Sequence, residues 1–216
     1  LKGKKALVTA GPTYEAIDPV RFIGNHSSGK MGYAIAEELY RLGAEVTLVS
    51  GPTSLHALED IKTIRIQSAQ QMFEACEKLF LSSDIIVMSA AVADYTPKNI
   101  AHQKIKKKTD DFDIALKKTI DILGTLGPQK RTQQTLIGFA LETNDGLAHA
   151  MDKLKRKNAD FIVLNSMQDK GAGFGTDTNK VTILGRNGES YVHALKTKKE
   201  VAKDISDLII AHQHSL

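Results

Sequence analysis

Short apolar runs alternate with amphipathic segments along most of this chain, and that alternation limits the possible folds more than any other feature. The predicted buried strands are Lys5–Ala10, Glu45–Ser50, Thr63–Gln67 and Ile85–Ser89. Helices are predicted between them, at Met31–Leu42 and from the capping residue Ser68 to Leu81. This βαβαβαβ order predicts an α/β fold with a doubly wound, mostly parallel sheet and right-handed crossovers.

The alternation stops after Ala90 and resumes at Thr135. Residues 91–103 are predicted to be loop, and residues 101–119 carry short alternating segments that predict an extended arm. The later predicted elements are a short helix at Asp121–Leu126, a strand at Thr135–Ala140, a helix at Gly146–Lys157, a strand at Phe161–Leu164, a hairpin of Val181–Leu184 and Tyr191–Ala194 around Asn187-Gly188, and a helix at Val201–His212. We therefore expect residues 1–216 to form a single domain with an arm.

A long polar loop is predicted between the first strand and the first helix. It runs from Gly11 to about Ser28, longer than the ~2–6 residues usual for such a connection, and long loops of this kind are often functional. Ser27 or Ser28 is expected to cap the helix, whose start would offer N–H groups to phosphate. Two nucleotide motifs are not matched, because Met31 replaces the hydroxyl residue of a P-loop and no G-x-G-x-x-G is present.

Composition excludes several classes of protein. No apolar run approaches the ~20 residues of a membrane span, so no membrane partner is expected. The net charge is +4, but there is no Trp and little aromatic interleaving among the lysines, so nucleic acid is not expected either. The single cysteine, Cys76, rules out an internal disulfide, suits the cytoplasm and is expected to be buried. The chain does not begin with Met, and we expect it to be a piece of a longer protein.

Ligands of open α/β sheets bind at the carboxyl ends of the strands, which here include Ser89–Asp94. Asp94 could bind Mg²⁺ together with phosphate oxygens, or it could cap a helix or turn. Lys153 and Lys157 share a helix face and could grip a polyphosphate, although such pairs also occur on solvated surfaces. The histidines show no zinc spacing and the serines no hydrolase triad. The residues themselves predict a cytosolic α/β protein that uses a nucleotide or phosphate.

Five motifs resemble those of one enzyme family. They are T-A-G-P-T-Y-E-A-I-D-P-V-R-F-I-G-N-H-S-S-G-K-M-G-Y-A-I-A (Thr9–Ala36), S-A-A-V-A-D-Y (Ser89–Tyr95), K-I-K-K (Lys104–Lys107), G-F-A-L-E-T (Gly138–Thr143) and K-R-K-N (Lys155–Asn158). From about Lys4 to the final helix the chain is similar to phosphopantothenoylcysteine synthetase, whose fold is Rossmann-like. In many bacteria this enzyme is the C-terminal half of a bifunctional coenzyme A biosynthesis protein. The other half is a flavin-dependent decarboxylase, so flavin is expected only outside this chain.

The resemblance implies ligation of 4′-phosphopantothenate to cysteine with CTP and Mg²⁺, through an acyl-cytidylate. It implies that Asn25 and Arg21 bind the acyl substrate, that Lys104 acts at the α-phosphate, and that Asp94 lies near the nucleotide and the cation. The other implied nucleotide contacts are Met88, Ser89, Ala90, Leu123, Gly124, Thr125, Leu126, Phe139, Lys153 and Lys157. It also implies a homodimer that pairs through the arm, so that one subunit helps to complete the site of the other.

Alternatives remain open. The nucleotide could be ATP, because the residues alone do not fix the base. An NAD(P)-dependent oxidoreductase is favoured by the fold class and disfavoured by the missing glycine fingerprint. A non-catalytic domain that binds phosphopantothenate is a further possibility. The sequence leaves open the oligomer beyond a dimer, the activity of the isolated chain and the role of the loop at residues 171–176.

Overall fold

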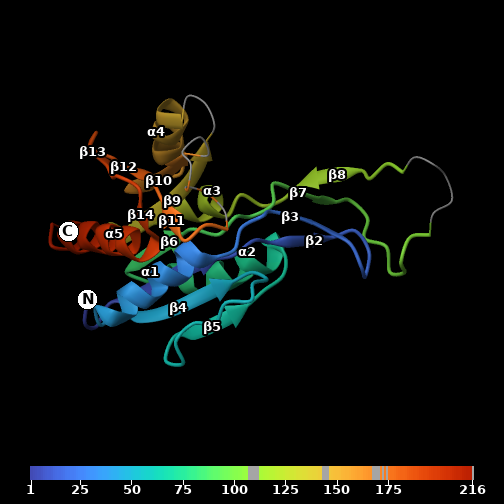
Figure 1. Cartoon of the computed structure of the whole chain (residues 1–216), viewed down its shortest axis with the longest axis horizontal. Helices are drawn as coiled ribbons and strands as arrows, with labels where there is room; N and C mark the ends of the chain where they lie inside the picture. Colours follow the sequence, from blue (N-terminus) through green and yellow to red (C-terminus); the bar gives the residue numbers. More distant parts are fainter. Residues whose placement is uncertain (107–111, 143–145, 167–170, 172, 174, 216) are drawn as a thin grey trace.

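The structure is a computed structural model that describes residues 1–106, 112–142, 146–166, 171, 173 and 175–215. Its main sheet has eight strands in the described part of the chain (Figure 1). In spatial order the parallel strands are β5 (Lys62–Arg65), β4 (Glu45–Ser50), β1 (Lys5–Ala10), β6 (Ile85–Met88), β9 (Thr135–Glu142) and β10 (Phe161–Ser166). Two antiparallel strands, β12 (Val181–Gly185) and β13 (Ser190–Val192), extend the far edge. The predicted doubly wound sheet is confirmed, with the strand order of a Rossmann fold.

Helices cover both faces of this sheet. Side chains alternate along β1, so that Ala6 and Val8 face α1 (Lys30–Arg41) and α5 (Lys198–Gln213). Leu7 belongs to the opposite cluster, where α2 (Ala69–Phe80), α3 (Ile122–Leu126) and α4 (Gly146–Arg156) pack. Cys76 of α2 is buried there, as expected. The central strands are buried on both faces, which explains why they read as continuous apolar runs.

The two long N-terminal helices begin differently. Ser68 caps α2 in a reciprocal capping box with Gln71, as predicted. The prediction that Ser27 or Ser28 caps α1 is wrong, because the N-cap is Gly29 and no side chain caps this end. Gly29 has a φ of 79°, in the left-handed region, and a Cβ there would lie 3.2 Å from the backbone N of Gly11. A close approach between two loops therefore selects glycine at this helix end.

Two excursions of the chain form an arm that projects from one side of the sheet (Figure 1). In the first, β2 (Tyr14–Ala16) pairs with β3 (Phe22–Gly24), and in the second β7 (Tyr95–Pro97) pairs with β8 (Leu116–Lys118). The sequence predicted only residues 101–119 as the arm, and that extent is too small. Residues 107–111 and parts of the predicted loop at 171–177 lie outside the described residues. A further small pair joins β11 (Thr178–Asn179) to β14 (Lys196–Thr197).

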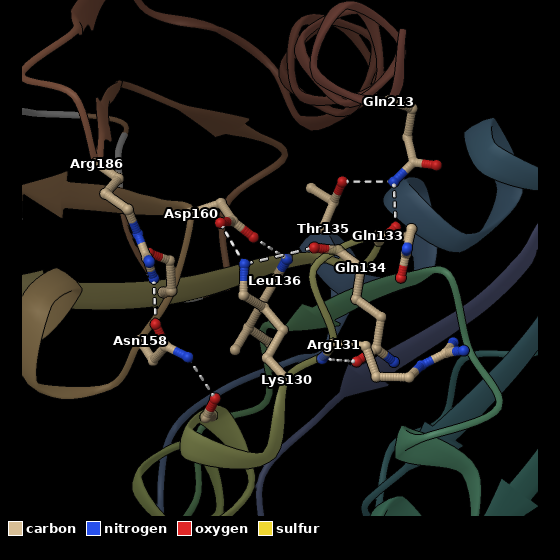
Figure 2. A network of polar contacts seen from close by, with 12 residues as sticks. Lys130, Arg131, Gln133, Gln134, Thr135, Leu136, Asn158, Asp160, Arg186 and Gln213 are labelled. Carbon is tan, nitrogen blue, oxygen red and sulfur yellow. Dashed lines mark hydrogen bonds and ion pairs between the residues drawn. The ribbon is translucent and has the colours of Figure 1, made fainter. Parts of the chain in front are cut away.

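A buried polar network lies at the amino ends of β9 and β10 (Figure 2). Lys130 and Asp160 form an ion pair there, and Asp160 also accepts a hydrogen bond from the Leu136 N–H at 2.8 Å. The Gln134 amide donates to the carbonyls of Phe80 and Ser83. This network joins the loop after the 3₁₀ turn η1 (Gly127–Gln129) to the sheet, at the end opposite the carboxyl ends of the strands.

Candidate functional site

A cavity of about 870 Å³ opens at the carboxyl ends of the parallel strands. It lies beside β1 and β6, the neighbouring strands from which the chain crosses over in opposite directions. Thr9 lines it from the end of β1, and Ser89 and Ala90 line it from the end of β6. Ligands of doubly wound sheets bind at this switch point, and the volume is in the range of small-molecule sites.

The N-terminus of α1 forms one wall of the cavity, through Gly29, Lys30, Met31 and Gly32. No side chain caps this helix end. At Gly32 a Cβ would lie 2.6 Å from both the Ala10 Cβ and the Ser89 Oγ, so the helix can approach the strand ends only because this residue is glycine. The positive end of a helix held against strand ends is an arrangement suited to phosphate.

Asn25 lines the cavity and is held in place by the loop that follows β6. Its amide Nδ2 donates to the Ala91 carbonyl at 2.9 Å. A parallel bridge between Pro12 and Ala91 ties the loop after β1 to the same segment. Within the part of the chain that the structure describes, this bond uses one N–H of the Asn25 amide and leaves the amide oxygen and the other N–H to meet a ligand. Asp94 is exposed at another part of the same lining.

Most of the nucleotide contacts implied by the sequence resemblance line this cavity. They are Met88, Ser89, Ala90, Asp94, Leu123, Phe139, Lys153 and Lys157. Gly124, Thr125 and Leu126 do not line it. Leu126 is buried in the core beneath α3, and a Cβ at Gly124 would lie 2.7 Å from the Lys157 Nζ. Of the four residues implied in this short helix, the structure therefore brings Leu123 to the cavity, and the neighbouring Ile122 also lines it.

Of the two predicted lysines, Lys153 lies in α4 and Lys157 directly follows it, and both have partners in the structure. Lys153 Nζ donates to the Phe139 carbonyl at 2.7 Å. Lys157 is buried and forms an ion pair with Asp121, whose side chain also accepts from the Gly124 N–H and so caps α3. Burial raises the pKa of Asp121, but the hydrogen bonds from Lys157 and Gly124 together lower it by more than burial raises it. The pKa of Asp121 therefore lies below its usual value. The pair fixes α3 against α4 at the rim of the cavity.

Basic side chains outnumber acidic ones in the lining. The basic side chains are Lys30, Lys118, Lys153, Arg156, Lys157 and Lys198, and the acidic ones are Asp94, Asp121 and Asp152. An excess of positive charge around a concave site attracts anionic ligands.

Lys198 was missed by the sequence reasoning. It lies at the start of the last helix, far along the chain from the loop between Gly11 and Ser28, and no local pattern marks it. Its Nζ donates to the carbonyls of Thr176 at 2.5 Å and Gly173 at 3.2 Å. Burial lowers its pKa, and repulsion from Lys30 adds to that effect. Asn165 and Asn179 also line this part, and they are hydrogen-bonded to each other at 3.1 Å.

Arg21 and Lys104 lie on the arm and do not line the cavity of their own chain. Arg21 forms an ion pair with the buried Asp18 and donates to the Ile105 carbonyl at 3.0 Å. Asp18 also accepts from the Ile105 N–H at 3.1 Å. The Arg21 hydrogen bond holds the pKa of Asp18 well below its usual range. The two excursions of the arm are thus fastened together next to Lys104, which is exposed. Within one chain, Asn25 and Asp94 share a site and Lys104 lies apart from it.

The described residues contain no group of three or more His, Cys, Asp and Glu side chains that could hold a metal. Asp94 offers one carboxylate, which fits Mg²⁺ because this ion is usually bound by one or two carboxylates together with substrate phosphates. In the same part of the chain, no helix has both the length and the apolar character needed to cross a membrane.

The fold and the site together define a Rossmann-like α/β protein with a cationic switch-point cavity. The chain belongs to the family described as the DNA/pantothenate metabolism flavoprotein C-terminal domain, whose model matches residues 1–212.

Two curated prokaryotic proteins are similar to this chain over nearly its whole length. The coenzyme A biosynthesis bifunctional protein CoaBC of Bacillus subtilis is 47% identical over 98% of this chain and 52% of its own length. A protein of an unknown prokaryotic organism, described as cysteine/cysteine sulfinic acid decarboxylase, is 48% identical over 99% of this chain and 60% of its own length. The chain thus spans somewhat more than half the length of these relatives.

A solved structure matches the chain end to end. The crystal structure of the C-terminal domain of a CoaBC protein has a TM-score of 0.86 and 45% identity, covering 100% of this chain and 98% of that one. The predicted resemblance to the C-terminal domain of bifunctional coenzyme A biosynthesis proteins is confirmed at the level of the family.

Proposed function

We propose that this chain is a ligase that joins 4′-phosphopantothenate to L-cysteine. It uses CTP, forms an acyl-cytidylate and releases CMP and pyrophosphate. The single observation that carries the proposal is the cationic cavity at the switch point, which contains Asn25, Asp94 and Ala90 together with the N-terminus of α1. The relatives named CoaBC, which act in coenzyme A biosynthesis, support the same reaction class. We assign the reaction to the cytoplasm.

The reaction must bring two anions together, and the cavity supplies what that requires. One carboxylate oxygen of phosphopantothenate attacks the α-phosphorus of CTP, and the bond to the pyrophosphate oxygen breaks. The amine of cysteine then attacks the acyl carbon, CMP leaves with the bonding electrons, and the amine gives up a proton. Lysines and helix N–H groups stabilise the charge that develops on phosphate oxygens. Lys30 and the first turn of α1 line the cavity and are assigned to this role, which requires the Lys30 ammonium to exchange its ion pair with Asp177 for a phosphate oxygen.

Asn25 is assigned to the acyl group. Its amide is already oriented by the Ala91 carbonyl, so its remaining N–H and its oxygen face the ligand at no cost in reorganisation. An uncharged amide can hold an acyl phosphate without repelling the carboxylate from which it forms. Asp94 is assigned to Mg²⁺ together with the phosphates, where the ion would neutralise charge on the triphosphate.

The arm is assigned to a homodimer in which it reaches the cavity of the partner subunit. Apolar side chains that remain exposed along the arm include Val20, Phe22, Tyr95, Ile100, Phe112 and Leu116. Large apolar side chains that stay exposed on one projecting part of the chain support a protein–protein contact there. This arrangement would deliver Arg21 to the acyl substrate and Lys104 to the α-phosphate in the second subunit, which would explain why neither lines its own cavity.

The test is product formation with purified protein, phosphopantothenate and cysteine, with either CTP or ATP as the nucleotide. We expect pyrophosphate release and product with CTP, and a clear preference for ATP would contradict the assigned nucleotide. Asn25→Asp is expected to block capture of the acyl-cytidylate, and Lys104→Gln to block its formation. Absence of product with both nucleotides would refute the ligase.

Mixing the two inactive variants tests the dimer. If Lys104 acts on the partner's cavity, each mixed dimer has one site with both changes and one site with neither. Activity then returns to about a quarter of the wild-type value after random reassociation. If Lys104 acts within its own chain, every site keeps one lesion and no activity returns.

A further inference from the structure

The peptide groups around Ala93 are held by two threonine side chains from different parts of the chain. The buried Ala93 N–H donates to Thr13 Oγ1 at 2.9 Å, and Thr119 Oγ1 donates to the Ala93 carbonyl at 2.6 Å. The Thr119 N–H also donates to the carbonyl of Asp94 at 2.9 Å. Thr13 has no exposed surface, and Ala93 is 5% exposed. The backbone on both sides of the Ala93–Asp94 bond is thus fixed by hydrogen bonds.

These threonines connect the body of the domain to the arm. Thr13 follows β1, Thr119 follows β8 at the root of the arm, and Ala93 lies between β6 and β7. Backbone pairing between the loops after β1 and β6 ends at the Pro12–Ala91 bridge. Beyond this bridge, the hydroxyl groups of Thr13 and Thr119 take the place of backbone pairing and hold the segment that leads to Asp94.

We propose that Thr13 and Thr119 are positioning residues for Asp94. They fix its backbone from two sides, so that the carboxylate meets the magnesium nucleotide at the cavity rim. The inference rests on the proposed function, which assigns Asp94 to the Mg²⁺ and nucleotide. Neither threonine is required to touch the reacting atoms, and Thr13 is too buried to do so.

Valine and serine substitutions separate the hydroxyl from the packing. Thr13→Val keeps the volume and branching of the side chain but leaves the buried Ala93 N–H without its acceptor. Thr13→Ser keeps the acceptor and loses a methyl group. Thr119→Val and Thr119→Ser form the same comparison at the carbonyl. Thr63→Val is the matched control, because Thr63 Oγ1 makes a similar bond to the Ile61 carbonyl away from the cavity.

The experiment measures Mg·CTP affinity by calorimetry and the kinetic constants of ligation for all five variants. We expect each of Thr13→Val and Thr119→Val to raise the Kd and KM for Mg·CTP about tenfold, the effect of losing one buried hydrogen bond. The KM for cysteine should not change, and both serine variants and Thr63→Val should bind like wild type. Valine variants with wild-type affinity, or serine variants as weak as valine variants, would overturn the proposal.

Amide hydrogen exchange of residues 90–95 supplies a readout that needs no ligand. Faster exchange in Thr13→Val but not in Thr13→Ser is expected, and unchanged exchange would count against the positioning role. If Thr13→Val does not fold, the half-buried Thr119→Val decides the question. A wild-type protein that binds Mg·CTP but makes no product would refute the proposed ligase activity and leave the positioning role open to test. The Mg·CTP affinities of the variants would then still show whether the two threonines position Asp94.

Discussion

The buried ion pair between Lys130 and Asp160 predicts a large loss of stability when one partner is removed. The two side chains are 9% and 7% exposed, respectively. Lys130→Met keeps an unbranched apolar chain of similar length and removes the charge. The Asp160 carboxylate would then stay buried with the Leu136 N–H as its remaining partner among the contacts drawn in Figure 2. Breaking a buried pair in this way costs about 3–5 kcal/mol, whereas an exposed pair contributes about 0–1 kcal/mol.

Thermal and urea unfolding measure this loss. At about 2–4 °C per kcal/mol for a chain of this size, the melting temperature should fall by about 6–20 °C. Adding Asp160→Asn to Lys130→Met removes the orphaned charge and keeps an oxygen for the Leu136 N–H, so the double variant should recover much of the loss. Lys203→Met is the control, because its pair with Asp207 is 62% and 55% exposed. A Lys130→Met variant that loses no more stability than Lys203→Met would refute the reasoning.

Three further predictions follow from single residues. The Arg21 hydrogen bond lowers the pKa of Asp18 on folding, so the ionised Asp18 stabilises the folded chain at neutral pH. As the pH falls below about 4, Asp18 of the unfolded chain is protonated first and this stabilisation is lost. The gap in unfolding free energy between wild type and Asp18→Asn should therefore narrow from about pH 6 to about pH 3, and a constant gap would contradict this. Burial raises the pKa of the Cys76 thiol to about 12, so a thiol reagent at neutral pH should label the protein only after unfolding, and rapid labelling of native protein would be inconsistent with it. Gly32→Ala should destabilise the fold by about 1–3 kcal/mol in urea unfolding, because its Cβ would lie 2.6 Å from Ala10 and Ser89, and a stabilised variant would show that the helix can shift freely.

The sequence predicted the main sheet well because its central strands are buried on both faces. Such strands appear as unbroken apolar runs, and β1 and β4 have the predicted bounds. The arm was predicted only in part, because β2, β3, β7 and β8 are three residues each and too short for a periodic pattern. The N-cap of α1 was mispredicted because Gly29 is selected by its approach to Gly11, a contact between distant loops.

The residues of the candidate site could likewise be predicted from the sequence only in part. Residues next to strand ends, such as Ser89 and Ala90, could be placed from the rule that ligands bind where parallel strands finish. Arg21 and Lys104 were chosen by resemblance, and where they lie depends on the direction of the arm, which no local pattern encodes. Lys198 reaches the cavity only through the docking of the last helix, and no local sequence pattern encodes that contact.

The Lys130–Asp160 network and the cavity occupy opposite ends of the same strands, and this separation has a consequence for adaptation. Changes that raise heat tolerance can accumulate around Asp160 without disturbing ligand contacts, while changes in nucleotide preference can arise around Ala90 without loosening the scaffold. Members of this family from hot and temperate habitats should therefore differ most at the amino ends of β9 and β10.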